Sequence, residues 1–398
     1  MPDHPLATDH AAALDDHLPL DGVLVADFSR ILAGPLCTMM LGDAGARVIK
    51  VEPPGGDETR RWGPPFVAGE STYFLSVNRN KESIVLDLKR EGGIEAARRL
   101  IQRADVVVEN FKDADRLRFG FEAGALQALS PGAVVCSIRG FDRDAADAAL
   151  PGYDLLAQAA GGLMAITGEP DGPPVKAGVA LSDVLTAHYA HGAILAALYA
   201  REKTGRGSAI EVSLFGATVA SLVNVAQAFL LTGEEPRRYG TAHPSIVPYQ
   251  TFAAADRSFA LAVASDRHFE RFARDVLERD DLARDPRFVT NAGRVTHRGT
   301  LIAEIEETIR RRTAAEWIER CRRAAIPAAL VERFEEIFAR PLVQTVEHPA
   351  IGPLPLVRSP LRTTAGAPRP LPPPRLGEHS RSVLRFLDLP ETSADDVA

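Results

Sequence analysis

The sequence is poor in cysteine, and the cysteines it has are far apart. Its 398 residues contain three, at Cys37, Cys136 and Cys321, with no CxxC pair among them. An odd number of widely spaced cysteines argues against a disulfide framework and against a zinc site, and is typical of reduced thiols. We therefore expect a cytoplasmic protein that binds no metal.

Positive charge and long apolar runs are also lacking. The formal net charge is -7, which argues against a nucleic-acid partner because such proteins carry a basic face. No continuous apolar run of about 18 residues occurs without charge or glycine, so we expect no membrane span. Residues 1–18 lack the cationic start and apolar centre of a signal peptide, and we expect them to form a disordered tail.

What the sequence does contain is the composition of an ordinary soluble globular protein, with 45% hydrophobic and 25% charged residues. Its length favours two domains. We expect a large α/β domain over residues 19–225, and a linker with a small α+β domain over 226–335. Residues 336–398 are expected to form a Pro-rich connector and a C-terminal segment that returns to the large domain.

The N-terminal part has the pattern of a nucleotide-binding βαβ unit. Residues 22–27 predict a buried strand, a helix follows Ala33-Gly34-Pro35, and residues 46–52 predict a second strand that ends in Glu52. Glu52 is either placed to meet a ribose hydroxyl or is a solvated strand end. The turn is not GxGxxG, which disfavours the alternative of a nicotinamide-dependent oxidoreductase, and we expect no nicotinamide cofactor.

Polar side chains follow the next buried strands, which are predicted at residues 105–109 and 134–138. Open parallel sheets bind ligands at the carboxyl ends of their strands, so these side chains together predict a phosphate site. Each of them alone is a typical surface residue. The side chains are Asn110, Lys112, Arg118 and Arg139.

Residues 176–207 organise the rest of the chain. They place an acid, Asp183, at the head of about five helical turns of apolar and small residues. A buried carboxylate is costly unless donors satisfy it, and a helix N-terminus supplies such donors. Asp183 is therefore either a helix cap or a functional acid that the helix keeps ionised. Further apolar helices are expected at residues 155–164 and 217–232.

Short motifs occur in a specific order and spacing along nearly the whole chain. They include Leu20-Asp21-Gly22, Ala33-Gly34-Pro35, Asn80-Lys81, Glu109-Asn110-Phe111, Gly152-Tyr153-Asp154, Lys203-Thr204-Gly205-Arg206-Gly207, His243-Pro244 and Leu376-Gly377-Glu378-His379. In this order they resemble the class III CoA-transferase family, which contains formyl-CoA:oxalate and carnitine CoA-transferases. The resemblance implies a Rossmann-like large domain, a small α+β domain and an interlaced, ring-like homodimer.

The resemblance also implies roles for individual residues. The family's nucleophile is an aspartate, which falls on Asp183 in this chain. CoA contacts carry over onto Lys81, Asn110, Arg118 and Arg139, with Glu52 beside them. Substrate contacts are implied at Arg30, Leu32, Ala33 and Tyr153.

Two of these positions bear on the substrate. Leu32 stands where formyl-CoA transferases carry glutamine, and Arg30 lies two residues earlier, which suggests a different acid, conceivably a dicarboxylate. Tyr153 stands where related 2-methylacyl-CoA racemases carry an acid–base histidine. A phenol with a pKa near 10 is a poor replacement, which favours transferase over racemase.

We therefore expect a CoA-transferase that moves CoA from an acyl-CoA to a carboxylic acid through an aspartyl-CoA thioester on Asp183. Its partners would be acyl-CoA, small acids and a second copy of the chain. Gly161-Gly162 or the loop at Gly240 are candidate oxyanion donors. The alternatives are a 2-methylacyl-CoA racemase-like enzyme and a catalytically idle CoA-binding protein of the same fold.

Overall fold

The computed structural model describes residues 18–143, 150–361 and 370–391, so the predicted disordered tail lies almost wholly outside it. The described chain divides into two compact units. The first contains the residues up to Leu163, the segment Ala177–Gln227 and the residues from Leu342 onward. The second contains Met164–Lys176 and Ala228–Pro341.

The segment Met164–Lys176 belongs to the second unit, although the sequence places it in the large domain. The Gly240 N–H donates to the Gly168 carbonyl at 2.9 Å, and Arg238 Nη2 donates to the Gly172 carbonyl at 2.8 Å. These bonds join residues far apart in the chain, and no local pattern indicates them.

The first unit is built on a six-stranded sheet in the order β5-β2-β1-β6-β7-β8, and all its strand pairs are parallel. The chain moves outward from β1 to β5 and then returns to β6, so the strand order reverses between β1 and β6. This architecture confirms the predicted α/β fold class. The strands are β1 (Leu24–Asp27), β2 (Arg47–Glu52), β5 (Lys81–Val85), β6 (Val106–Glu109), β7 (Val134–Arg139) and β8 (Ala209–Ser213).

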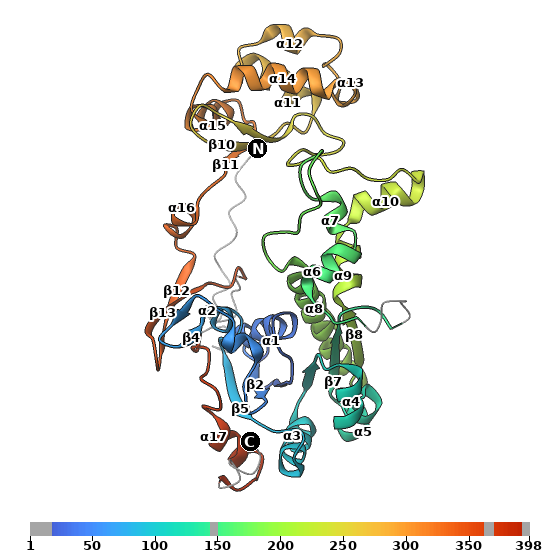
Figure 1. Cartoon of the computed structure of the whole chain (residues 1–398), viewed down its shortest axis with the longest axis vertical. Helices are drawn as coiled ribbons and strands as arrows, with labels where there is room; N and C mark the ends of the chain where they lie inside the picture. The colour runs from blue at the N-terminus through green and yellow to red at the C-terminus, as the bar shows by residue number, and fades with distance from the viewer. Residues whose placement is uncertain (1–17, 144–149, 362–369, 392–398) are drawn as a thin grey trace, which may run out of the picture. The chain divides into compact units, whose positions relative to one another are not determined.

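Helices cover both faces of this sheet (Figure 1). On one face, α1 (Ala33–Asp43) and α8 (Leu181–Thr204) pack against alternate strand residues such as Val25 and Val106. On the other face, α3 (Glu91–Arg103), α5 (Ala123–Leu129) and α17 (Ser380–Phe386) pack against the residues between them. Burial on both faces explains why these strands are nearly continuous runs of valine and isoleucine.

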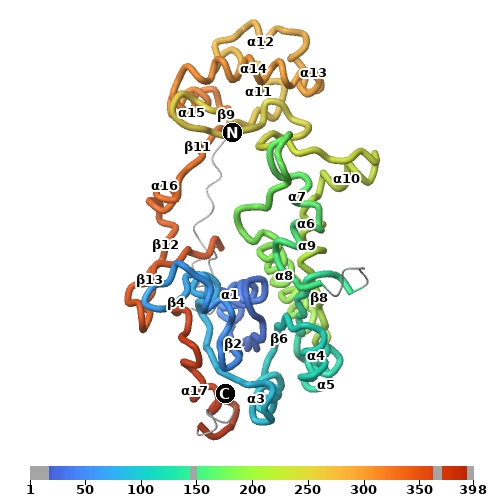
Figure 2. Tube along the Cα trace, viewed as in Figure 1, coloured from blue at the N-terminus to red at the C-terminus, as the bar shows by residue number. Residues whose placement is uncertain are grey.

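The C-terminal segment returns to the first unit and covers its edge strand β5. It can be followed in red from β13 to α17 in Figure 2. The His379 N–H donates to the Ser83 carbonyl at 2.9 Å, and the Gly377 N–H donates to Ser83 Oγ at 2.9 Å. These bonds use the polar groups that an edge strand otherwise leaves open.

Two predicted helices are broken in the structure. Residues 217–232 form α9 (Leu214–Ser221) and α10 (Val223–Thr232), which are bent by 77°. Within the described ranges no single helix is long and apolar enough to cross a membrane, and this pair passes that test only when taken together. Residues 155–164 form α6 (Asp154–Ala160) and α7 (Leu163–Ile166), because Gly162 takes a left-handed φ of +83° that ends a helix.

Shorter elements complete the first unit and its connections. They are η1 (Glu58–Arg61), β3 (Phe66–Val67), β4 (Glu70–Ser71), α2 (Thr72–Ser76), α4 (Asp113–Phe119), β12 (Val343–His348) and β13 (Gly352–Val357).

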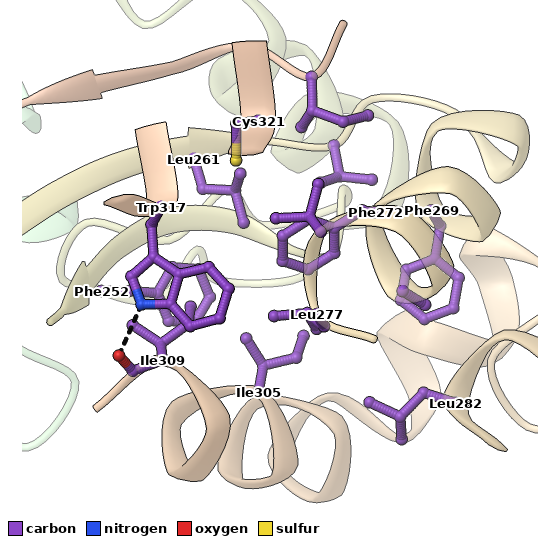
Figure 3. Close-up of a cluster of buried hydrophobic side chains, with 14 of the residues drawn as sticks. Phe252, Leu261, Phe269, Phe272, Leu277, Leu282, Ile305, Ile309, Trp317 and Cys321 are labelled. Atoms are coloured by element: carbon purple, nitrogen blue, oxygen red, sulfur yellow. Dashed lines mark hydrogen bonds between the residues drawn. The ribbon is translucent and has the colours of Figure 1, made fainter. Parts of the chain in front are cut away.

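The second unit has a three-stranded antiparallel sheet in the order β11-β10-β9, covered by short helices. Its core gathers several phenylalanines around Trp317, whose Nε1–H donates to the Ile309 carbonyl at 2.7 Å (Figure 3). The elements are β9 (Tyr249–Ala253), β10 (Ser258–Ala262), α11 (Asp266–Arg271), the π-helical η2 (Phe272–Val276), α12 (Asp280–Arg284), α13 (Asn291–Thr296), α14 (Arg298–Ile309), α15 (Ala314–Arg323), β11 (Ala328–Leu330) and α16 (Phe334–Phe338).

Candidate active site

Asp183 lies in the first turn of α8 and is 9% exposed. It does not cap the helix, because the residue before the helix is Ala180. The Ser182 N–H is instead bound by Asp154 Oδ1 at 2.9 Å, so the cap comes from α6. The capping interpretation of Asp183 is therefore wrong. The Ala33 N–H at the start of α1 faces the Asp183 carboxylate closely enough to lower its pKa.

Burial, and after it the negative charge of Asp154, raise the pKa of Asp183 to about 7, and the Ala33 N–H opposes this shift without cancelling it. We expected the helix N-terminus to keep this acid ionised, and that expectation is wrong because desolvation outweighs the helix donors. A carboxyl with this pKa is partly protonated at neutral pH and becomes a carboxylate on slight alkalinisation.

The N-terminus of α1 supplies the donor that meets Asp183. Gly34 follows Ala33 there, and a Cβ on Gly34 would lie 2.2 Å from the Ser29 Cβ. Glycine is therefore required for the chain to turn back on itself before the helix. Free N–H groups at a helix start attract negative charge, which makes the first turn of α1 a better oxyanion site than either glycine loop expected from the sequence.

Two of the N–H groups in those glycine loops, on Gly161 and Gly240, are occupied. The Gly161 N–H donates to the Ala157 carbonyl at 2.8 Å and closes the end of α6. The Gly240 N–H binds the Gly168 carbonyl within the second unit. Neither group is available to a developing oxyanion without breaking a bond.

Arg30 and Asn110 meet at the point where the strand order reverses. The Arg30 N–H donates to Asn110 Oδ1 at 3.0 Å, and Asn110 Nδ2 donates to the Arg30 carbonyl at 2.8 Å. The Arg30 guanidinium is 29% exposed and pairs with Glu58 at 3.1 Å. Leu32 follows on the same loop and is half-buried. In open α/β sheets this crevice is where ligands bind.

The first unit also contains an aromatic pocket that the sequence does not predict. Trp62, Pro64 and Tyr73, with their neighbours, line a cavity of about 290 Å³, and the Trp62 and Tyr73 rings lie edge to face at 5.1 Å. Burial, with the charge of Asp183 as the next cause, raises the pKa of Tyr73 to about 12. The phenol therefore stays protonated and is a hydrogen-bond donor close to the candidate nucleophile.

Two predicted CoA contacts are corrected by the structure. The side chain of Lys81 is fully buried, and its Nζ binds Asp27 at 3.0 Å and the Pro35 carbonyl at 2.8 Å. Glu52 is 1% exposed and pairs with Arg60 at 2.7 Å. A phosphate cannot reach this ammonium group, and a ribose cannot reach this carboxylate, without breaking buried ion pairs.

The remaining predicted cations lie nearer the surface. Arg118 is exposed on α4, over the Phe119 ring. Arg139 is 11% exposed and pairs with Asp113 and Glu211, each at 2.7 Å. Lys89 follows β5 and is exposed, whereas Lys81 is the first residue of that strand.

Tyr153 precedes α6 and is 55% exposed. It neighbours Asp154, whose carboxylate caps α8. The structure therefore brings Tyr153, Ala33 and Asp183 into one region of the first unit. Lys81 and Glu52 lie inside the unit instead, where they hold its loops.

Comparison with known proteins gives one consistent result. The model of CoA-transferase family III matches residues 20–380. The chain is 39% identical over 378 residues to the succinyl-CoA:glutarate CoA-transferase of Homo sapiens, covering 92% of this chain and 85% of that protein. It is 40% identical over 395 residues to the succinate–glutarate CoA-transferase of Agrobacterium fabrum, covering 94% and 97%.

Solved structures agree with these relatives. A CaiB/BaiF family protein from Brucella suis superposes with a TM-score of 0.82 at 38% identity, over 94% of this chain and all of that one. The Mycobacterium tuberculosis protein Rv3272 superposes with a TM-score of 0.82 at 28% identity, over 93% of this chain and 100% of its own.

The pKa of Asp183 predicts how stability depends on pH. The folded chain keeps a proton to about pH 7 that the unfolded chain releases near 3.8. The free energy of unfolding therefore falls as pH rises between these values, by up to about 4 kcal/mol. Asp183→Asn removes this dependence of the free energy of unfolding on pH. The variant should therefore be as stable as the wild type near pH 4, and more stable than the wild type by a margin that grows up to about pH 8. Denaturant titrations across pH measure the difference.

The exposed Glu122 provides the control, since Glu122→Gln should show no such trend. An Asp183→Asn variant that is less stable than the wild type at pH 8 would contradict the assignment of a buried acid with a raised pKa.

Proposed function

The chain belongs to CoA-transferase family III, and from this premise we propose that it transfers CoA from an acyl-CoA to a dicarboxylic acid through a thioester on Asp183. The observation that carries the proposal is a buried carboxyl with a pKa of about 7 that faces the N-terminus of α1. A carboxylate nucleophile needs no metal or redox cofactor for this reaction. The family assignment agrees with the resemblance of the sequence motifs.

The reaction proceeds by four balanced substitutions. The Asp183 carboxylate attacks the thioester carbonyl of the donor, which forms a mixed anhydride and releases CoA thiolate. The thiolate attacks the Asp183 carbonyl, which forms aspartyl-CoA and releases the donor acid. The acceptor carboxylate then attacks aspartyl-CoA, forming a second anhydride and thiolate. The thiolate attacks the acceptor carbonyl, which yields the new acyl-CoA and restores Asp183.

Each substitution develops an oxyanion, and the first turn of α1 supplies donors for it. The Ala33 N–H faces the Asp183 carboxylate closely enough to lower its pKa, so it lies beside the carbon that is attacked in the second and third steps. The protonated Tyr73 supplies another donor in the same region. Donors that are fixed before reaction stabilise developing charge without reorganisation.

The acceptor is proposed to be a dicarboxylate because Arg30 lies on the loop that leads into α1. Its guanidinium is partly exposed while one nitrogen is held by Glu58. A planar guanidinium binds a carboxylate through two parallel hydrogen bonds. Two relatives are named for succinyl-CoA and glutarate, or for succinate and glutarate, and a third is named as an acetyl-CoA:oxalate CoA-transferase.

The phosphates of CoA are proposed to meet exposed cations around the carboxyl edge of the sheet. Arg118 and Lys112 on the β6 side, and Lys89 on the β5 side, present charge to solvent. Arg139 already pairs with two acids and is therefore the weaker partner for a phosphate. Asn110 contributes by holding the Arg30 backbone. The racemase alternative is disfavoured because Tyr153, a phenol, stands where an acid–base histidine is needed.

The first test is capture of the covalent intermediate. Wild-type protein mixed with succinyl-CoA should gain the mass of CoA less one water, and peptide mapping should place it on Asp183. Adduct formation should become faster as pH rises through about 7, because only the carboxylate attacks. Asp183→Asn should form none, while the control Glu122→Gln should react as the wild type does. CoA binding without any adduct would refute the thioester mechanism and favour the alternative of a catalytically idle CoA-binding protein.

The second test is acceptor selectivity. Arg30→Met removes the proposed partner of the distal carboxylate and should raise KM for glutarate by about 10- to 100-fold, the equivalent of one charged hydrogen bond. KM for a monocarboxylate of equal length should stay unchanged. Arg99→Met is the control, since this arginine pairs with Glu95 on the exposed face of α3. An equal rise in KM for both acids would show that Arg30 does not bind the second carboxylate.

We also propose that the chain forms a homodimer. The helix α10 exposes Leu230 by 74% and Leu231 by 78%, and adjacent large apolar side chains on a surface indicate an interaction site. Light scattering of the wild type should give twice the chain mass, and the pair Leu230→Glu with Leu231→Glu should lower it to one chain. Leu117→Glu, at an exposed leucine on α4, is the control. A monomeric wild type would refute the proposal.

A further inference from the structure

The loop between β1 and α1 is held by hydrogen bonds from three neighbouring elements. The Ser29 carbonyl accepts from Lys50 Nζ on β2 at 2.9 Å. The Arg30 backbone exchanges two bonds with Asn110, after β6. The Ile31 N–H donates to Asp57 Oδ2, before η1, at 3.2 Å. The loop therefore has no backbone freedom at the residues that precede α1.

Ile31 is the strained member of this loop, with φ at +74°. A β-branched side chain in the left-handed region is an outlier, which is strained and persists only where the surroundings impose it. Two residues later the Ala33 N–H faces the Asp183 carboxyl and lowers its pKa. The strain thus lies immediately before the group that faces the candidate nucleophile.

Asp57 is suited to impose this conformation. Its side chain is fully buried, pairs with Lys50 at 3.0 Å, and accepts from the Thr59 N–H at 2.9 Å and Thr59 Oγ1 at 2.8 Å. Burial by itself would raise the pKa of Asp57, but the charge of Lys50 and the Thr59 bonds outweigh it and lower the pKa to about 2. The carboxylate is therefore ionised at every working pH and is fixed in position.

We propose that Asp57 is a positioning residue for the transfer reaction: it holds Ile31 in the left-handed conformation and so aims the first turn of α1 at Asp183. This inference rests on the proposed function. Ser29 and Arg30 are anchored by Lys50 and Asn110, but their bonds do not oppose the strain at Ile31. Without Asp57, Ile31 relaxes to a negative φ, the turn rotates, and the Ala33 N–H moves away from Asp183.

The consequence for the reaction is a slower chemical step with intact CoA binding. A misplacement of about 1 Å near reacting groups can cost about 100-fold in rate. The Asp57 side chain is fully buried, and its partners within the described part of the chain are Ile31, Lys50 and Thr59, so it does not touch CoA. The loss should therefore appear in kcat and in the rate of adduct formation rather than in KM for acyl-CoA.

The test compares Asp57→Ala with Asp57→Ala combined with Ile31→Gly. Asp57→Ala should slow the formation of the Asp183 adduct by about 10- to 100-fold and leave KM for succinyl-CoA within about threefold of the wild type. Adding Ile31→Gly should restore most of the rate, because glycine adopts a positive φ without strain. Stopped reactions analysed by mass spectrometry give the rate, and circular dichroism checks the fold.

A buried ion pair at the other end of the same helix is the matched control. Asp43 pairs with Arg79, and both side chains are 7% exposed. Asp43→Ala should lower stability as Asp57→Ala does but should leave adduct formation near the wild-type rate. Restoration by Ile31→Gly should also be absent in the Asp43→Ala background, since Ile31 is not held by Asp43.

Several outcomes overturn the inference. An unchanged adduct rate in Asp57→Ala does so, as does a loss that Ile31→Gly fails to restore. If Asp57→Ala does not fold, Asp57→Asn, which retains side-chain volume and one acceptor, is measured with the same criteria; failure of both to fold makes Asp57 a folding residue only. A wild type that forms no adduct on Asp183 instead refutes the proposed function, so the two failures are distinguishable.

Discussion

Two buried ion pairs, Lys50 with Asp57 and Lys81 with Asp27, hold the candidate site in one arrangement. Both side chains of each pair are fully buried. A buried charge left without its partner is strongly destabilising, so each element that carries one must stay in register with the others. One pair joins β2 to the loop that follows it, and the other joins the start of β5 to the end of β1. The loops around Asp183 are therefore as well determined as the sheet itself.

The same pairs explain why α1 begins where it does. Lys81 Nζ binds the Pro35 carbonyl in the first turn of the helix at 2.8 Å, and the Thr38 hydroxyl donates to Asp27 Oδ2 at 2.7 Å. A cation that the sequence assigns to CoA thus anchors the helix from inside. Burial lowers the pKa of Lys81 to about 8, although the charge of Asp27 opposes that shift. In the structure Lys81 positions the helix and is buried away from solvent.

Asp183 shows how folding and chemistry are balanced in this unit. Its burial comes from the packing of α8 against α1, in a core that includes Ala187 and Ala190. That packing removes water from the carboxyl and raises its pKa, and Asp154 adds to the effect while it caps the helix. A pKa near the working pH keeps an acid both stable in the fold and available for reaction. The cost is a fold that is less stable at alkaline pH.

Much of the fold was predictable because it follows from local patterns. The runs of valine and isoleucine predict β1, β2, β6 and β7, since a strand buried on both faces must be apolar throughout. The breaks within α6–α7 and α9–α10 were not predicted. Gly162 marks the first of them, but the apolar run across Leu222 has the periodicity of one helix, and the 77° bend occurs where Val223 takes a positive φ of +33°.

The sequence by itself determined the α/β sheet, the family and the candidate nucleophile. Strand composition, motif order and one acid at a helix start can all be recognised without knowing which distant residues meet. The tertiary structure alone decided what surrounds that acid. It placed the Ala33 N–H beside Asp183, buried Lys81 and Glu52, and bound Ile31 to Asp57. Those contacts join residues distant in sequence, and desolvation, which determines the charge of Asp183, exists only after the chain has packed.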